Sequence, residues 1–149
     1  MNTRILAVAA MVVGFGALAY GAEVQIKTTE VDGRLRDDFS NLSFVNDPEV
    51  LGVWESVDFV RDMEDFTPGE KNFQGSLYLE KLVFNPKGKT DMPWFGWTKG
   101  VVMHLGGDHT ASRYTIKELA GARYMFFEWK SGDYIIRHQK PKYYVLKKK

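Results

Sequence analysis

The sequence feature that most constrains the fold is a strand-like run at residues 51–60, which opens on Gly52-Val53-Trp54. It follows a turn or helix-start signal, Asn-Asp-Pro-Glu, at residues 46–49, and strand-like runs alternate with turn signals after it. A tryptophan at the start of a first strand is large enough to plug one end of a small barrel. Gly52 would let another backbone approach closely. The sequence therefore predicts an all-β fold organised around Trp54.

Turn signals divide the chain after residue 60 into short strand-like runs. Asn-Pro-Lys-Gly at residues 85–88 and Ala-Gly-Ala at residues 120–122 are strong examples. Residues 94–105 are either one bent strand or two, because Gly96 and Gly100 permit a bend. Sequential hairpins favour an antiparallel meander, and closure would remove its exposed edges. The expected fold is an antiparallel up-and-down barrel of about eight strands, at residues 52–60, 76–84, 94–98, 101–105, 111–119, 123–129, 134–137 and 143–146.

The two faces of the first strand leave an alternative open. The face that carries Trp54 also carries Ser56 and Asp58, whereas the opposite face is more apolar and carries Val57 and Phe59. If Trp54 points inward along a regular strand, Ser56 and Asp58 point inward too. A β-bulge would instead insert one extra residue into the strand, so that the residues after it change faces.

The N-terminal residues 1–22 are predicted to be a secretory signal peptide. Arg4 precedes an apolar stretch at residues 5–20, and small residues suited to cleavage follow. The alternative is a core helix or a membrane anchor, but the stretch is short and broken by glycine. We therefore expect an exported protein, periplasmic or secreted, with no integral membrane segment after cleavage. Residues 23–41 are expected to form a flexible N-terminal arm, and residues 42–149 the barrel domain.

Composition limits how this domain is stabilised. The chain of 149 residues fits one domain, and 44% hydrophobic residues supply a real core. The absence of cysteine excludes disulfides and a lipoprotein anchor, so burial alone must hold the exported domain. The formal net charge is only +1, but residues 23–70 hold 13 acids and 4 bases, whereas later residues hold 6 acids and 15 bases. In a barrel closed head to tail, these halves meet and attract.

Gly52-Val53-Trp54 resembles the opening motif of the lipocalins and the wider calycin superfamily. Those proteins are up-and-down barrels that bind small hydrophobic molecules in the barrel mouth. Asp133-Tyr134 is similar to the second lipocalin motif, with glycine in place of threonine. The family also has a late arginine that lies over the first-strand tryptophan, and Arg137 is the nearest candidate for it. Arg137 follows Asp133-Tyr134 more closely than the family spacing allows, so the two motif assignments cannot both hold. We prefer Arg137 as the partner of Trp54, because a guanidinium over an indole face is favourable. The C-terminal helix of the family has no counterpart in this sequence.

A second resemblance covers residues 47–60 and 126–134. These blocks look like an uncharacterised bacterial lipocalin-like domain, found in exported proteins and appended to sensor proteins of the regulatory metallopeptidase type. The resemblance implies extracytoplasmic binding or sensing, and it brings no catalytic residue. Within it, Gly52, Trp54 and Arg137 are expected to close the barrel.

Abundant aromatic residues supply the candidates for ligand binding, and most aromatic residues pack in the core of a barrel. Alternation allows only one of the rows Tyr124/Phe126/Glu128 and Met125/Phe127/Trp129 to face inward, and the sequence leaves open which one. An incompletely filled interior would take a small hydrophobic molecule. If the interior is filled, the barrel would instead be a structural or protein-interaction domain that acts as a sensing or adaptor module. The predicted ligand-binding residues are Trp94, Trp97, Tyr114, Phe127 and Trp129.

Other chemistry has weaker support. His104, Asp108 and His109 are near one another in the chain, but ordinary turn histidines are favoured over a metal site, and no metal or cofactor is predicted. Asp58 and Glu128 would form an acid/base pair only if both pointed inward. Export argues against nucleic acid as the partner of the basic C-terminal part. The sequence thus predicts a non-catalytic binding protein for a small hydrophobic ligand, with a protein-interaction barrel as the alternative.

Overall fold

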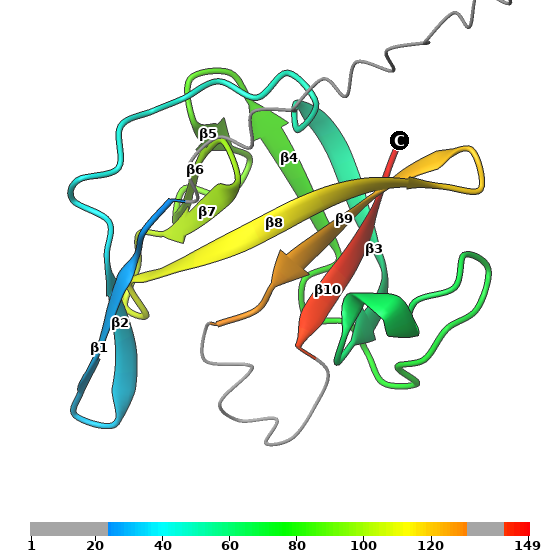
Figure 1. The fold of residues 1–149 in the computed structure, drawn as a ribbon, viewed down its shortest axis with the longest axis horizontal. Helices are drawn as coiled ribbons and strands as arrows, with labels where there is room; N and C mark the ends of the chain where they lie inside the picture. Colours follow the sequence, from blue (N-terminus) through cyan, green and yellow to red (C-terminus); the bar gives the residue numbers. More distant parts are fainter. Residues whose placement is uncertain (1–23, 131–141) are drawn as a thin grey trace, which may run out of the picture.

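The strand-like runs that begin at Gly52 form a closed antiparallel barrel in the computed structural model, which describes residues 24–130 and 142–149 (Figure 1). Each strand pairs with the next, and the last returns to pair with the first. The eight barrel strands of the described residues are β3 (Gly52–Val60), β4 (Lys81–Asn85), β5 (Lys89–Thr90), β6 (Phe95–Thr98), β7 (Val101–His104), β8 (Thr110–Leu119), β9 (Ala122–Glu128) and β10 (Tyr143–Lys148). The predicted all-β, up-and-down barrel is therefore confirmed.

Several strand boundaries differ from the expected ones. β4 begins at Lys81 instead of residue 76, and the residue before it contacts β3 through a hydrogen bond from the Ser56 amide to the Glu80 carbonyl at 2.8 Å. Residues 94–105 form two strands, since Gly100 adopts a φ of +81° in the turn between them. β5 spans two residues, too few for a periodic pattern. The expected strand at residues 134–137 and the expected signal peptide lie outside the described residues.

The segment expected to be a flexible arm contains a β-hairpin instead. β1 (Lys27–Val31) pairs with β2 (Arg34–Asp38), and Figure 1 shows this hairpin projecting from one side of the barrel. Buried Asp37 attaches it: its carboxylate accepts from the Ala111 amide at 2.7 Å and lies 3.2 Å from the Lys130 ammonium. All residues of β1 are exposed, so the strand lacks the apolar alternation that would have predicted it.

A β-bulge at Val57 resolves the alternative on β3. β10 pairs Leu146 with Ser56 but the preceding residue, Val145, with Asp58, so Val57 is the extra residue. Trp54 before the bulge and Phe59 after it therefore both join the main core. Asp58, which a regular strand would have placed on the inner face with Trp54, is displaced to the opposite side.

The start of β3 closes one end of the barrel around a fully buried Trp54. Its indole N–H donates to the Val50 carbonyl at 2.7 Å, and the Lys148 ammonium lies 5.4 Å from the ring centroid. β10 thus supplies a cation over this tryptophan, whereas Arg137, the residue expected there, lies outside the described residues. The prediction that another backbone approaches Gly52 closely is wrong, because the nearest atom to an added Cβ is the side-chain Lys148 Cε at 3.8 Å. Glycine is required at this position by its backbone φ of +113°.

A second hydrophobic cluster covers the outer face of β9 and β10. It forms beneath the loop that contains the short 3-10 helix η1 (Met63–Asp65), where Phe66 packs against Tyr124 and Phe126 with ring centroids 5.0 Å and 5.9 Å apart. The last part of this long connection, residues 71–80, is called the strap. Helices in the described part of the chain lack the length and hydropathy that a membrane crossing needs.

Asp58 anchors the strap to β3. Its buried carboxylate accepts hydrogen bonds from the backbone amides of Asn72 and Phe73, at 2.9–3.1 Å, and from the Asn72 side chain. The buried carboxylate thus obtains hydrogen-bond donors from the strap backbone. Asp58 therefore fixes the start of the strap beside β3, and the Ser56 amide bonds to the carbonyl of Glu80 at its end.

The acidic first half and the basic second half of the chain meet where the barrel closes. The Lys149 ammonium at the end of β10 lies 2.7 Å from the Glu55 carboxylate of β3. The Asp37–Lys130 pair joins the same two halves at the hairpin. Because Lys149 and Glu55 are largely exposed, their pair adds little stability, whereas the Asp37 pair is buried.

Candidate functional site

The barrel interior is packed by the aromatic residues that were expected to line a pocket. Phe127 of β9 and Trp129, which directly follows β9, lie in the main core, and their ring centroids are 5.8 Å apart. Trp129 also contacts Tyr144 of β10, at 4.9 Å. Trp97 is 1% exposed, and its indole N–H donates to the carbonyls at Asn85 and Lys89. Phe127, Trp129 and Trp97 therefore contribute to core packing.

The other two predicted ligand-binding residues are placed differently. Trp94 is 47% exposed and lies in the turn before β6. Tyr114 is buried, and its hydroxyl donates to the Asp47 carboxylate at 2.8 Å. Burial is the main cause that raises the pKa of Tyr114 above its usual range, and hydrogen bonding to Asp47 raises it further. The five residues thus divide between core, surface and one position beside a cleft.

That cleft has a volume of about 710 Å³ and lies between the chain before β3 and the strands β6, β7 and β8. Thr98, Val101 and Arg113 line it and face one another across these three strands. Their neighbours Trp97, Val102 and Tyr114 belong to the main core, so alternation directs this row outward. The cleft is therefore on the outer wall of the barrel, and its volume is within the range of small-molecule sites.

Hydrogen bonds fix the opposite wall of the cleft, which residues 41–45 and Val24 provide. The Val45 amide donates to the Thr98 hydroxyl at 2.8 Å, and the Lys99 amide donates to the Val45 carbonyl at 2.9 Å. The Arg113 guanidinium donates to the Val24 carbonyl at 2.6 Å. These contacts join chain segments that are 50 to 90 residues apart, and they fix the two walls of the cleft relative to each other.

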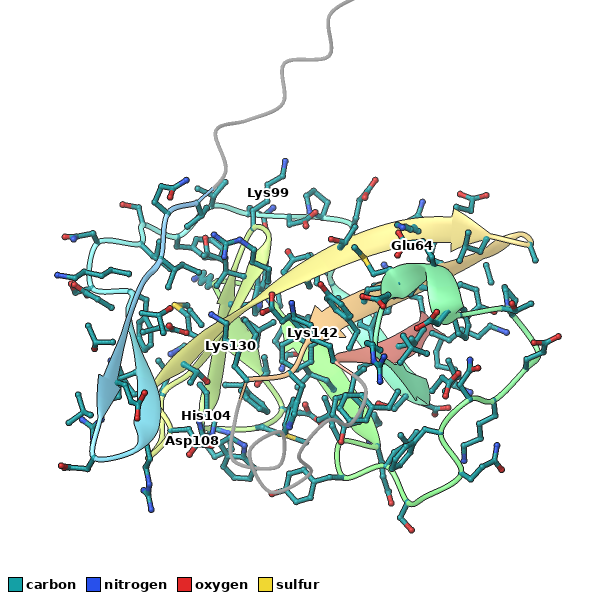
Figure 2. The ribbon with its side chains drawn as sticks, turned by 60° about the horizontal axis from the view of Figure 1, so that its bottom comes forward. Glu64, Lys99, His104, Asp108, Lys130 and Lys142 are labelled. Atoms are coloured by element: carbon teal, nitrogen blue, oxygen red, sulfur yellow. The ribbon has the colours of Figure 1, made fainter. Side chains whose placement is uncertain are left out.

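The chemistry of the cleft is apolar with positive charge at its edge. Leu42, Val45 and Val101 supply aliphatic surface, and the charged residues of the lining are Lys99 and Arg113, both basic. Figure 2 shows Lys99 at the end of the barrel away from His104 and Asp108. Sequence reasoning missed this site, because its walls come from four separate segments and no local pattern connects them.

A second, smaller cavity of about 440 Å³ lies between β3 and the strap. Polar residues line most of it, including Lys71, Gln74 and Glu80. The Ser56 hydroxyl, also in its lining, is buried without a hydrogen-bond partner. This cavity has the polar character expected where a loop meets a strand, and it lacks the aliphatic wall of the larger cleft.

The histidines near the turn between β7 and β8 have different neighbours. His104 Nδ1 lies 3.9 Å from the Asp108 carboxylate, whereas the His109 ring stacks on Phe39 with a centroid distance of 4.3 Å. Within residues 24–130 and 142–149, no group of three or more His, Asp or Glu side chains is arranged to hold a metal ion.

We expect the pKa of His104 to lie below 6.5, because burial disfavours its charged form more than Asp108 favours it. Asp108→Asn should therefore lower this pKa further. Because the pKa of His104 is lower in the folded protein than in the unfolded chain, the folded protein binds fewer protons near this pH. His104 therefore supports the stability of the fold above pH 6.5, and this support is lost as the pH falls below that value. An NMR titration of the His104 ring measures the shift; a higher pKa in Asp108→Asn would contradict the geometry.

The fold and the cleft together define a class: a closed, eight-stranded antiparallel barrel, counted over the described residues, with a basic-edged cleft on its outer wall. Comparisons with protein-family models, with curated proteins and with solved structures found no match. The residues of the cleft themselves are thus the basis for a functional interpretation.

Proposed function

We propose that this protein is an exported, non-catalytic, lipocalin-like binding protein that takes a small, largely apolar ligand. The observation that carries the proposal is the cleft of about 710 Å³ with an aliphatic wall. The start of the first barrel strand at Gly52-Val53-Trp54 and the cation over Trp54 support the likeness to lipocalins. The predicted signal peptide supports export.

The cleft, and not the barrel interior, is the proposed binding site. The inward aromatic rings contact one another at centroid distances of 4.5–6.4 Å, so they occupy the space that an internal ligand would need. A ligand in the cleft would instead cover the aliphatic side chains of Leu42 and Val45. Each Å² of apolar surface removed from water favours binding by about 25 cal/mol before the costs of association.

No catalytic role is proposed. Asp58 and Glu128 were the candidate acid/base pair, but backbone amides of the strap occupy the Asp58 carboxylate. Glu128 lies on the row of β9 that also carries Tyr124 and Phe126, the residues of the outer cluster. The two carboxylates therefore do not converge inside the barrel.

A protein-interaction barrel is the second candidate. Its support is a set of large apolar side chains on the surface, including Tyr78, which is 72% exposed, and Trp94. Trp94 and the exposed Leu105 lie together, since the Leu105 amide donates to the Trp94 carbonyl at 2.7 Å. Such surface groups are typical of contacts with another protein when they gather in a patch.

Blocking the cleft tests the proposal. Ser43→Trp places a large ring at the exposed edge of the cleft, and we expect it to weaken binding of a neutral apolar fluorescent probe, N-phenyl-1-naphthylamine, by about tenfold or more. Gln74→Trp is the matched control, because it puts the same ring in the second cavity. Equal probe affinity in the wild type and Ser43→Trp would refute the cleft as the site. If Ser43→Trp weakens probe binding, native mass spectrometry of the protein purified from its own host would identify the natural ligand.

A further inference from the structure

We propose that the surface beside the cleft docks on an anionic lipid membrane. Two consecutive exposed apolar side chains, Phe44 and Val45, enter the outer part of the bilayer, and the exposed lysines around them, Lys87, Lys89 and Lys99, contact the lipid head groups. These five residues are called the docking patch. The inference adds a partner to the proposed function, and it rests on that function because an apolar ligand of the cleft dissolves in a membrane.

The barrel holds the apolar part of the docking patch at the surface. Phe44 is 49% exposed and Val45 is 54% exposed. The Phe44 ring packs against the buried Trp97 ring in a T-shaped arrangement, with centroids 5.3 Å apart. The Val45 amide donates to the Thr98 hydroxyl at 2.8 Å. Both apolar residues are therefore already ordered, so little conformational freedom is lost when a partner covers them.

Separate contacts place the lysines around these two residues. The Phe44 ring lies over Gly88, the residue between two lysines of the docking patch, because a Cβ added at Gly88 would be 3.2 Å from that ring. On the other side, the Lys99 amide donates to the Val45 carbonyl at 2.9 Å. In the described part of the chain, none of the three ammonium groups forms an ion pair.

The acids closest along the chain to the docking patch are Asp47 and Asp91. Asp47 is buried, and its carboxylate accepts from the Tyr114 hydroxyl. Asp91 is exposed, and its carboxylate accepts from the Val83 amide in the middle of β4, at 2.8 Å. The three exposed lysines therefore leave the docking patch with an excess of positive charge, which anionic lipid head groups attract.

The size of the docking patch and its place beside the cleft favour a membrane over an acidic protein. A stable protein interface buries about 800 Å² on each partner, from roughly 20–30 residues. Binding to a bilayer surface instead adds up from a small inserted apolar area and the charge of each lysine. Val45 and Lys99 also line the cleft. Docking therefore brings the aliphatic wall of the cleft to the membrane in which an apolar ligand is dissolved.

Co-sedimentation with vesicles tests the inference, with protein purified after export so that the predicted signal peptide is removed. We expect about tenfold stronger binding to vesicles that contain phosphatidylglycerol than to vesicles of pure phosphatidylcholine, and weaker binding as salt is added. Lys87→Gln/Lys89→Gln should reduce binding about tenfold or more, because each lysine near an anionic surface strengthens binding about fivefold. Phe44→Gln should reduce binding about fivefold, since it removes the inserted ring.

Matched controls change the same chemical groups outside the docking patch. Tyr78→Gln removes an aromatic ring that is 72% exposed. Lys71→Gln/Lys81→Gln removes two ammonium groups, one from the strap and one from the first residue of β4, at the other end of that strand from the docking patch. Both controls should bind vesicles within about twofold of the wild type. Equal losses in patch and control variants, or equal binding to the two kinds of vesicle, would overturn the inference.

N-phenyl-1-naphthylamine, measured without vesicles, separates this inference from the proposed function. Phe44, Lys87 and Lys89 lie outside the lining of the cleft, so their variants should bind this probe within about twofold of the wild type. Probe binding without vesicle binding would overturn the membrane inference and leave the cleft as a ligand site. Vesicle binding without probe binding would refute the cleft function and leave the docking patch. Binding to polyglutamate without binding to vesicles would overturn the inference, because the partner would then be an acidic protein.

Discussion

Replacing Trp54 with alanine is expected to lower the free energy of unfolding by about 3–5 kcal/mol, the range for deleting a large buried aromatic side chain. Trp54 is fully buried in the main core at the closed end of the barrel. Its loss leaves a cavity, and it also leaves the buried Val50 carbonyl without the indole N–H that it accepts. The Lys148 ammonium loses the ring beneath it. Urea unfolding followed by circular dichroism measures the change.

Trp94→Ala is the matched control for this experiment. The same side chain is removed, but Trp94 is 47% exposed, so the expected loss is below about 1 kcal/mol. Trp54→Phe keeps an aromatic ring and removes the N–H, and it should fall between the two. Similar losses in Trp54→Ala and Trp94→Ala would show that the barrel is not organised around residue 54.

Lys130→Met is expected to detach the N-terminal hairpin from the barrel. Asp37 is 1% exposed, and besides the Lys130 ammonium its carboxylate accepts from the Thr28 hydroxyl and the Ala111 amide. Removing the cation leaves a buried carboxylate without a counter-charge, which costs about 3–5 kcal/mol in comparable buried pairs. A two-stranded hairpin is marginal on its own, so release of β1 and β2 is the way to avoid this cost.

Hydrogen exchange distinguishes release of the hairpin from global unfolding. In Lys130→Met, amides of β1 and β2 should exchange faster, whereas those of β8 and β9 should stay protected. Lys149→Met removes a cation from an exposed pair and should change stability by less than about 1 kcal/mol. The double variant Asp37→Asn/Lys130→Met should recover part of the hairpin protection, because no unpaired charge remains. Unchanged exchange of β1 and β2 in Lys130→Met would contradict this account.

Local patterns were enough to predict most barrel strands. β3 has the bounds expected from the run at residues 52–60, and the alternation of Tyr114 and Ile116 predicted β8 within one residue at its start. The Ala120-Gly121 turn, in which both residues have a positive φ, separates β8 from β9 as its composition indicated. These features depend on neighbours along the chain, and they are therefore visible in the sequence.

The candidate site was hardly predictable. Of the five aromatic residues proposed to bind a ligand, Tyr114 borders the cleft, whereas Trp97, Phe127 and Trp129 pack in the core and Trp94 is on the surface. An aromatic residue in a strand fits a pocket wall and a packed interior equally well. Which of the two it joins depends on the volume that the other seven strands leave, and that volume has no local signature.

The order of residues, read alone, favoured a closed antiparallel barrel, because alternating strands joined by tight turns leave edges that closure satisfies. Pairing between distant strands settled the rest. The bulge at Val57 turns Phe59 inward and Asp58 toward the strap, and it exists through the register of β10 against β3. The cleft likewise exists because residues 43–45 bond to Thr98 and Lys99, a contact between segments more than 50 positions apart. Such contacts depend on the packing of the whole chain, so only the folded structure contains them.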